Sequence, residues 1–182
     1  KILFIGGTGV ISSACVQEAV TVGLDVTVLN RGHTQRNIPG GIRRLHADVR
    51  DPHSVQQALA DESFDVVINF IAFEPAHVEQ DFDMFRDRCR QYVFISSASC
   101  YQTPTPRLPI TEDMPLANPV WEYSQKKIAC EQFLMDVHEQ NNFPVTIVRP
   151  SHTYDQTKLP NRGGWTAIDR LRRGKPIFIH GD

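Results

Sequence analysis

Short apolar runs alternate with longer amphipathic stretches along most of the chain. Six runs predict strands, at residues 1–5, 25–29, 43–46, 66–71, 92–96 and 145–149. The stretches between them predict helices at 10–22, 52–60, 78–89 and 121–140, with Asp51 as an N-cap and Gly23 as a C-terminal stop. Strands that alternate with helices, several of them apolar on both faces, predict a doubly wound α/β domain built on a parallel sheet.

The remaining segments give a loop and a short C-terminal tail. Five prolines between 104 and 119 exclude regular structure and predict a long surface loop. Beyond the sixth strand, the pattern predicts a helix at 166–173 and a last apolar strand at 177–179. The chain stops just after that apolar run, so we expect it to end before a complete natural terminus.

Composition narrows the class of protein. The 182 residues carry 19 Lys+Arg and 21 Asp+Glu, with 41% hydrophobic and 22% charged residues, which is typical of a globular domain. This balance gives no general attraction to polyanions and argues against a nucleic-acid coat. No apolar run reaches the ~20 residues of a membrane span. The four cysteines lack C-x-x-C spacing, which argues against zinc, and we expect a cytoplasmic protein without a bound metal.

A glycine-rich turn stands between the first strand and the first helix. Its sequence is Gly6-Gly-Thr-Gly9-Val-Ile-Ser12, with serine in place of the usual third glycine. Glycines here let the backbone approach a pyrophosphate, whose charge is favoured by the free N–H groups of the following helix. A simple tight turn is the alternative, but the position favours a dinucleotide site.

The end of the second strand bears on the choice of cofactor. An acidic residue that binds the adenosine ribose of NAD is common there, whereas this chain has Asn30 and Arg31. Arg31 could pair with a 2′-phosphate, and Arg36 is a weaker candidate for the same contact. The residues therefore favour NADP, and NAD beside a solvated Arg31 stays open.

Three further residues suggest acid/base chemistry. Tyr123 and Lys127 are four apart at the start of a predicted helix, so they share one face. A nearby ammonium stabilises a phenolate, and the positive charge of a bound nicotinamide would help further, so we expect the two to lower the pKa of the tyrosine. Ser97 follows the fifth strand, at the sheet edge where ligands of open α/β sheets bind.

Together these segments resemble the extended short-chain dehydrogenase/reductase superfamily, in its NAD-dependent epimerase/dehydratase-like, sugar-nucleotide branch. The matching pieces also include Asp48-Val49, Asn69 and Arg149-Pro150-Ser151, and they span nearly the whole chain in the family's order. The resemblance implies Ser97 as the catalytic serine, Tyr123 as the acid/base and Lys127 as its partner. It implies cofactor contacts from the turn and the strand ends: Gly6, Thr8, Gly9, Val10, Ile11, Asn30, Arg31, Asp48, Val49, Asn69, Ile71, Ala72, Pro150 and Ser151. Asp48 as a turn cap and Asn69 as a plain connector remain the alternatives.

The resemblance also sets expectations for the whole protein. It implies a Rossmann-like domain over 1–182, with a substrate-binding region starting at about 151–182 and most of the C-terminal substrate lobe missing. It implies a homodimer through the helices at 78–89 and 121–140.

The implied function is an NAD(P)-dependent epimerase or reductase that transfers hydride at a secondary alcohol of a nucleotide sugar or similar substrate. Ala98 and Ser99 replace the Asp-Glu pair of the branch's dehydratases, which argues against dehydration. The alternative is a non-catalytic NAD(P)-sensing or RNA-binding module. A basic stretch could contact RNA, a substrate diphosphate or only solvent: Arg162, Arg170, Arg172, Arg173 and Lys175. The joint presence of serine, tyrosine and lysine favours the enzyme.

Overall fold

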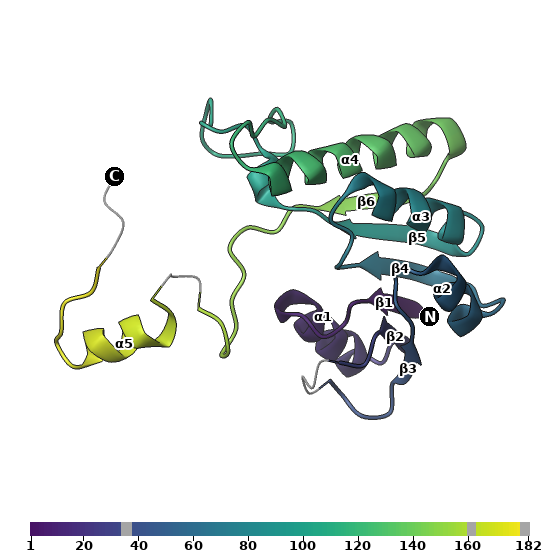
Figure 1. Cartoon of the computed structure of the whole chain (residues 1–182), viewed down its shortest axis with the longest axis horizontal. Coiled ribbons are helices and arrows are strands. Elements are labelled where there is room, and N and C mark those ends of the chain that lie inside the picture. Colours follow the sequence, from purple (N-terminus) through teal and green to yellow (C-terminus); the bar gives the residue numbers. More distant parts are fainter. Residues whose placement is uncertain (34–37, 160–162, 179–182) are drawn as a thin grey trace. The chain divides into compact units, whose positions relative to one another are not determined.

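A six-stranded sheet forms the centre of the protein. The computed structural model describes residues 1–33, 38–159 and 163–178, and its internal contacts divide the chain into two units, Lys1–Ser151 and His152–Asp182. In the first unit the strand order is β3-β2-β1-β4-β5-β6, and all neighbouring pairs are parallel (Figure 1). The strands are β1 (Ile2–Ile5), β2 (Val26–Asn30), β3 (Arg43–His46), β4 (Phe64–Asn69), β5 (Cys89–Ile95) and β6 (Val145–Val148). The predicted α/β fold is confirmed.

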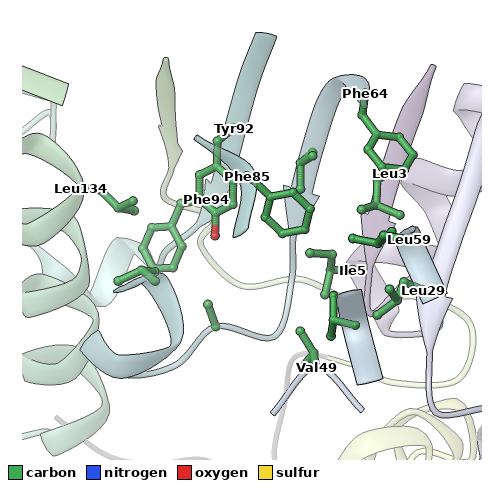
Figure 2. Close-up of a cluster of buried hydrophobic side chains, with 14 of the residues drawn as sticks. Leu3, Ile5, Leu29, Val49, Leu59, Phe64, Phe85, Tyr92, Phe94 and Leu134 are labelled. Atoms are coloured by element: carbon green, nitrogen blue, oxygen red, sulfur yellow. The ribbon is translucent and has the colours of Figure 1, made fainter. Parts of the chain in front are cut away.

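Helices cover the two faces of the sheet unequally. α1 (Val10–Thr21) packs on one face, where Val16 and Ala19 join a cluster with Phe4 and Val28. The larger cluster on the opposite face, shown in Figure 2, is covered by three helices: α2 (Pro52–Leu59), α3 (Pro75–Phe85) and α4 (Glu122–Asn141). In β1, alternate residues supply the two clusters, as the twofold period of a strand requires: Ile2 and Phe4 face α1, and Leu3 and Ile5 face the larger cluster.

The strand order places a binding crevice at one edge of the sheet. From β1 the chain moves outward to β2 and β3, and then returns to place β4 on the other side of β1. In open α/β sheets, ligands bind outside the carboxyl ends of the strands at such a reversal. The glycine turn follows β1 and the segment Phe70–Glu74 follows β4, so both lie at this reversal.

The strands predicted at 66–71 and 92–96 begin earlier, at Phe64 and Cys89. Two other predicted elements differ more from the structure. The helix predicted at 78–89 begins at Pro75 and ends at Phe85, because proline is tolerated at the first helical position and Cys89 already pairs with Phe64 in the sheet. The strand predicted at 177–179 is wrong for Ile177 and Phe178, which lie in no strand, and residue 179 lies outside the described residues. Three apolar residues form a strand only where a neighbouring strand hydrogen-bonds with their backbone. In the described part of His152–Asp182, the only β-type pairing is the isolated bridge between Asp155 and Lys158.

The described part of the second unit holds one helix, α5 (Gly164–Arg172). The Trp165 indole N–H donates to the Gln156 carbonyl oxygen at 3.0 Å, and the Arg170 guanidinium donates to the Pro176 carbonyl oxygen at 2.9 Å. Arg162, part of the predicted basic stretch, lies outside the described residues. A substrate-binding role for this segment stays a prediction. Among the helices of the described residues, none combines the length and apolarity needed to cross a bilayer.

Candidate active site

The glycine turn tolerates no side chain at its first two positions. Gly6 has φ +87°, and a Cβ there would lie 2.7 Å from Ile71 Cγ2. A Cβ on Gly7 would lie 2.9 Å from Val28 Cγ1. Both distances are below any ordinary van der Waals contact, so close packing against β2 and the segment after β4 requires glycine here.

Ser12, in place of the third glycine, ties the turn together. Its hydroxyl donates to the Gly6 carbonyl oxygen at 2.8 Å and accepts the Gly9 N–H at 2.7 Å. The side chain is buried, so the two bonds are shielded from water. The serine therefore fixes the turn against the first turn of α1 by hydrogen bonds as well as by its small size.

A cleft of about 360 Å³ opens beside this turn, at the carboxyl ends of the strands. Eight of the predicted cofactor-binding residues line it: Gly6, Thr8, Gly9, Asn30, Arg31, Asp48, Val49 and Ile71. Six lining residues were not predicted from the sequence: Leu29, Gly32, His33, Ala47, Arg50 and Phe73. The glycine turn and the ends of β2 and β3 thus share one cavity.

The other predicted cofactor residues lie outside this lining. Val10 and Ile11 begin α1, where the first backbone N–H groups have no intrahelical acceptor. Ala72 is fully buried, and Pro150 accepts the Ala98 N–H at 2.9 Å, beside Ser97. Ser151 is exposed.

Asn69 differs from the prediction of a cofactor contact. It is fully buried; its amide N–H donates to Asp81, and its carbonyl oxygen accepts the Ile71 N–H at 2.7 Å. The side chain therefore holds the segment after β4 from beneath and does not line the cleft. Asp81 also accepts the Tyr92 hydroxyl, and burial raises the pKa of this carboxyl to about 6.

Arg31 and Asp48 face each other across the cleft. The Arg31 guanidinium lies 4.0 Å from Asp48 Oδ2, and both side chains are about half-exposed. Such a pair is worth at most about 1 kcal/mol, so either partner can turn to a ligand at little cost. Asn30 accepts the Gly32 N–H at 2.9 Å, which shapes the loop after β2. Arg36 lies outside the described residues.

Arg50 is the most informative residue that sequence reasoning missed. Its guanidinium donates to the Ile71 carbonyl oxygen and lines the cleft between the β3 and β4 ends. Burial lowers its pKa, and the nearby Asp81, Asp48 and Glu74 carboxylates oppose that shift. Its position two residues after Asp48, at a strand end of the predicted binding edge, was the signal that could have identified it.

Lys127 is a buried cation at the same edge. Its ammonium donates to the Ala72 carbonyl oxygen at 2.6 Å and the Ile95 carbonyl oxygen at 2.7 Å, so it joins the ends of β4 and β5. The nitrogen also lies 5.8 Å from the centroid of the Tyr123 ring. Burial lowers the pKa of Lys127 to about 8, which leaves it charged at neutral pH.

Tyr123 is half-buried between two aromatic rings. Its ring centroid lies 4.9 Å from that of Trp121 and 6.5 Å from that of Phe73. Burial raises the pKa of the phenol, because loss of hydration disfavours the charged phenolate. This direction holds for the protein without a bound ligand, and the lowering expected from Lys127 and a bound nicotinamide together stays a prediction.

Ser97 caps the short helix η1 (Ala98–Cys100), and its hydroxyl accepts the Ser99 N–H at 3.2 Å. Beneath it, a buried network links the strand ends to α4. Glu131 accepts the Ser96 hydroxyl and takes a bidentate contact from Arg149, which also donates to the Tyr101 hydroxyl at 3.1 Å. Ser97, Tyr123 and Lys127 thus come from two segments held at one edge, the start of η1 and α4, although no hydrogen bond links the Ser97 and Tyr123 hydroxyls among the described residues.

The residues present fit a dinucleotide. Gly9 lines the cleft, and within the described part of the chain a Cβ on it would meet only the Ser12 hydroxyl within 4 Å, at 3.2 Å. The start of α1 offers backbone donors to a pyrophosphate, and Arg31 and Asp48 stand where the adenosine end would bind.

A family model described as "NAD dependent epimerase/dehydratase family" matches residues 2–182. The chain belongs to this family. A UDP-glucose 4-epimerase of Lactobacillus helveticus is 30% identical over 168 residues, covering 82% of this chain and 50% of the relative. A UDP-glucose 4-epimerase of Bacillus subtilis is 28% identical over 169 residues, covering 78% of this chain and 49% of the relative. The chain thus spans about half the length of these curated relatives.

Solved structures agree on the fold. Pal from Bacillus thuringiensis superimposes with a TM-score of 0.81 at 22% identity, covering 100% of this chain and 66% of that chain. WbmG of Bordetella bronchiseptica, solved with NAD and UDP, gives a TM-score of 0.75 at 22% identity, covering 97% and 61%. Membership of the epimerase/dehydratase family confirms the resemblance seen in the sequence, and the roles of Ser97, Tyr123 and Lys127 stay predictions.

Proposed function

We propose that this chain forms the dinucleotide-binding part of an NAD(P)-dependent epimerase that acts on a nucleotide sugar. The observation that carries the proposal is the position of Lys127, buried beside Tyr123 and anchored to the ends of β4 and β5. The glycine cleft opens at the same sheet edge. A cofactor cleft and a tyrosine–lysine pair at one edge support hydride transfer better than binding alone.

In the proposed reaction, Tyr123 takes the proton of the substrate's secondary hydroxyl while hydride leaves the carbon that bears it. The bound dinucleotide supplies the hydride acceptor and carries positive charge in its oxidised form. That charge and the Lys127 ammonium both favour the phenolate, against the burial that raises the pKa of Tyr123. Ser97 donates a hydrogen bond to the substrate oxygen as it becomes a carbonyl. Return of hydride to the opposite face, with the proton returned by Tyr123, completes an epimerisation.

The cofactor assignment is NADP in preference to NAD. Arg31 is half-exposed in the cleft and its pairing with Asp48 is weak, so its planar fork is available to a 2′-phosphate. Calorimetric titration with both cofactors should show that Arg31→Ala weakens NADP binding and leaves NAD binding unchanged. Arg44→Ala removes an exposed arginine of the neighbouring β3 that does not line the cleft, and it is the matched control. Preference for NAD, unaffected by Arg31→Ala, would reject the NADP assignment.

The substrate class is tested by turnover. The purified full-length protein that contains this chain is incubated with its preferred cofactor and either UDP-glucose or UDP-galactose, and the epimer is quantified by chromatography. We expect interconversion, and about a 100-fold or greater loss of kcat in Tyr123→Phe. Unchanged cofactor affinity in Tyr123→Phe is the control that the site remains folded. Cofactor binding without turnover of these or other nucleotide sugars would contradict the proposal.

A cofactor-sensing module is the second candidate. A 26% identical relative over 141 residues is the nitrogen metabolite regulation-like protein bik4 of Gibberella fujikuroi. The raised pKa of Tyr123 is also compatible with a site that binds a dinucleotide without acid/base work. The turnover assay separates the two functions. Homodimerisation through α3 and α4 and a cytoplasmic location stay predictions, the first testable by sedimentation.

A further inference from the structure

Three serine hydroxyls form a continuous chain from α4 to the candidate catalytic serine. The Ser124 hydroxyl donates to Ser99 Oγ at 2.8 Å, and Ser99 Oγ lies 2.8 Å from Ser97 Oγ. Ser124 is fully buried and directly follows Tyr123 in α4. These linked hydroxyls therefore join α4, which carries the candidate acid/base Tyr123, to the segment that carries Ser97.

The number of hydroxyl hydrogens determines which serine donates to which. A hydroxyl has one hydrogen to donate and two lone pairs to accept with. Ser124 gives its hydrogen to Ser99, so Ser99 must place its own hydrogen elsewhere. Across residues 1–33, 38–159 and 163–178, Ser97 Oγ is the one acceptor that the Ser99 hydroxyl contacts. The arrangement in which Ser99 donates to Ser97 gives the Ser124 and Ser99 hydrogens an acceptor each and leaves the Ser97 hydrogen for another partner.

This direction leaves Ser97 as a donor. Its oxygen then accepts both the Ser99 hydroxyl and the Ser99 backbone N–H, which occupies its two lone pairs. Its own hydrogen has no protein acceptor among the described residues, and the side chain is half-buried, so the hydrogen can reach a substrate oxygen. A serine held in this way is organised to stabilise a developing carbonyl or alkoxide before the substrate arrives.

Asn118 provides a second connection between the Ser99 segment and the start of α4. The Asn118 amide donates to the Ser99 carbonyl oxygen at 2.9 Å, and its own oxygen accepts the Trp121 N–H at 3.1 Å at the start of α4. The segment that carries Ser99 and the first turn of α4 are thereby fixed to each other.

We propose that Ser99 and Ser124 are positioning residues that set Ser97 as a hydrogen-bond donor toward the substrate oxygen. This inference rests on the proposed function, because it assigns the two residues to the same hydride-transfer site. Neither residue touches the reacting atoms in this account. Their effect on catalysis passes entirely through Ser97.

A kinetic double-mutant cycle tests that statement. Ser99→Ala should lower kcat about 10-fold with little change in KM, and Ser97→Ala about 100-fold, because loss of a preorganised donor raises the barrier. In the Ser97→Ala background, Ser99→Ala should have no further effect on kcat. Ser99→Thr, which keeps the hydroxyl, should retain most of the wild-type kcat. A further fall of kcat in the double variant overturns the proposal.

A second cycle needs no substrate. Ser99→Ala and Ser124→Ala remove the same hydrogen bond, so the double variant should lower Tm by little more than the larger single effect. Thr103→Val, which deletes an exposed hydroxyl in the following loop, is the matched control and should combine additively with either. Additive effects of Ser99→Ala and Ser124→Ala overturn the hydroxyl chain. Absence of turnover in the wild-type protein overturns the proposed function instead, so the two failures are distinguishable.

Discussion

The Lys127 ammonium donates to the Ala72 carbonyl oxygen at 2.6 Å, across the gap between α4 and the end of β4. This bond anchors the candidate catalytic lysine to Ala72. The residue before Ala72, Ile71, lines the cofactor cleft. In the protein without ligand, the hydrogen-bond partners of the lysine are thus backbone carbonyl oxygens at the edge of the sheet that carries the cleft. Tyr123 is its neighbour at longer range.

Replacement of this lysine should abolish activity. Lys127→Met keeps the length and apolar volume of the side chain but removes the charge, so we expect kcat to fall about 100-fold or more. Turnover of the nucleotide sugar measures this. Lys126→Met is the control, because Lys126 is partly exposed and pairs with Glu122 at 3.1 Å on the helix surface. Near-wild-type kcat in Lys127→Met would show that the lysine is only structural.

Gly6→Ala should separate steric packing from backbone strain. Gly6 and Gly23 have similar positive φ, +87° and +80°, but only at Gly6 would a Cβ collide, with Ile71. A non-glycine residue in this conformation costs about 1–2 kcal/mol. We expect Gly6→Ala to lower the free energy of unfolding by about 1–3 kcal/mol more than Gly23→Ala, because overpacking is added. Equal losses in denaturant titrations would show that Ile71 moves aside freely.

The stability of the protein should depend on Asp81 in acid. Burial raises the pKa of Asp81 to about 6, whereas the unfolded value is about 3.9. Between these values the folded state binds more protons than the unfolded state, so this group's contribution to stability rises as pH falls from about 6 toward 4. Asp81→Asn removes the contribution. The wild-type free energy of unfolding minus that of Asp81→Asn should therefore increase from pH 7 to pH 4, and a decrease would contradict the burial of a charged carboxyl.

Thr27→Val should stabilise the protein. Within the described residues, Thr27 Oγ1 is the one buried side-chain polar atom without a hydrogen-bond partner. Valine has the same shape without the hydroxyl, so we expect a gain of about 1 kcal/mol in the free energy of unfolding. Thr146→Val is the contrast, because the Thr146 hydroxyl accepts the Gln91 amide at 2.8 Å and its loss should destabilise. Destabilisation by Thr27→Val would indicate an unseen partner for that hydroxyl.

Local patterns were sufficient to predict most of the fold. Asp51 caps α2 by accepting the His53 N–H at 3.1 Å, as its position before Pro52 indicates. The strands were predicted because their apolar runs lie between turn residues. The strand prediction at 177–179 was wrong for Ile177 and Phe178, because an apolar pattern does not reveal whether a neighbouring strand is present.

The sequence was a better guide to which residues form the candidate site than to the contacts that they make. The glycine turn, Arg31 and Asp48 were identified from strand ends, which the topology brings to one edge. The position of Arg50 across the cleft and the burial of Asn69 against Asp81 depend on tertiary packing. The pKa of Tyr123 depends on desolvation, which a spacing of four residues does not reveal.

The central claim is that the cleft beside the glycine turn binds a nicotinamide dinucleotide. Calorimetric titration of the purified protein with NADP and NAD, repeated on Gly6→Ala, tests it most directly. We expect one molecule bound per chain, with tighter binding of NADP, and loss of binding in Gly6→Ala while the protein remains folded. Failure of the folded wild-type protein to bind either dinucleotide would contradict it.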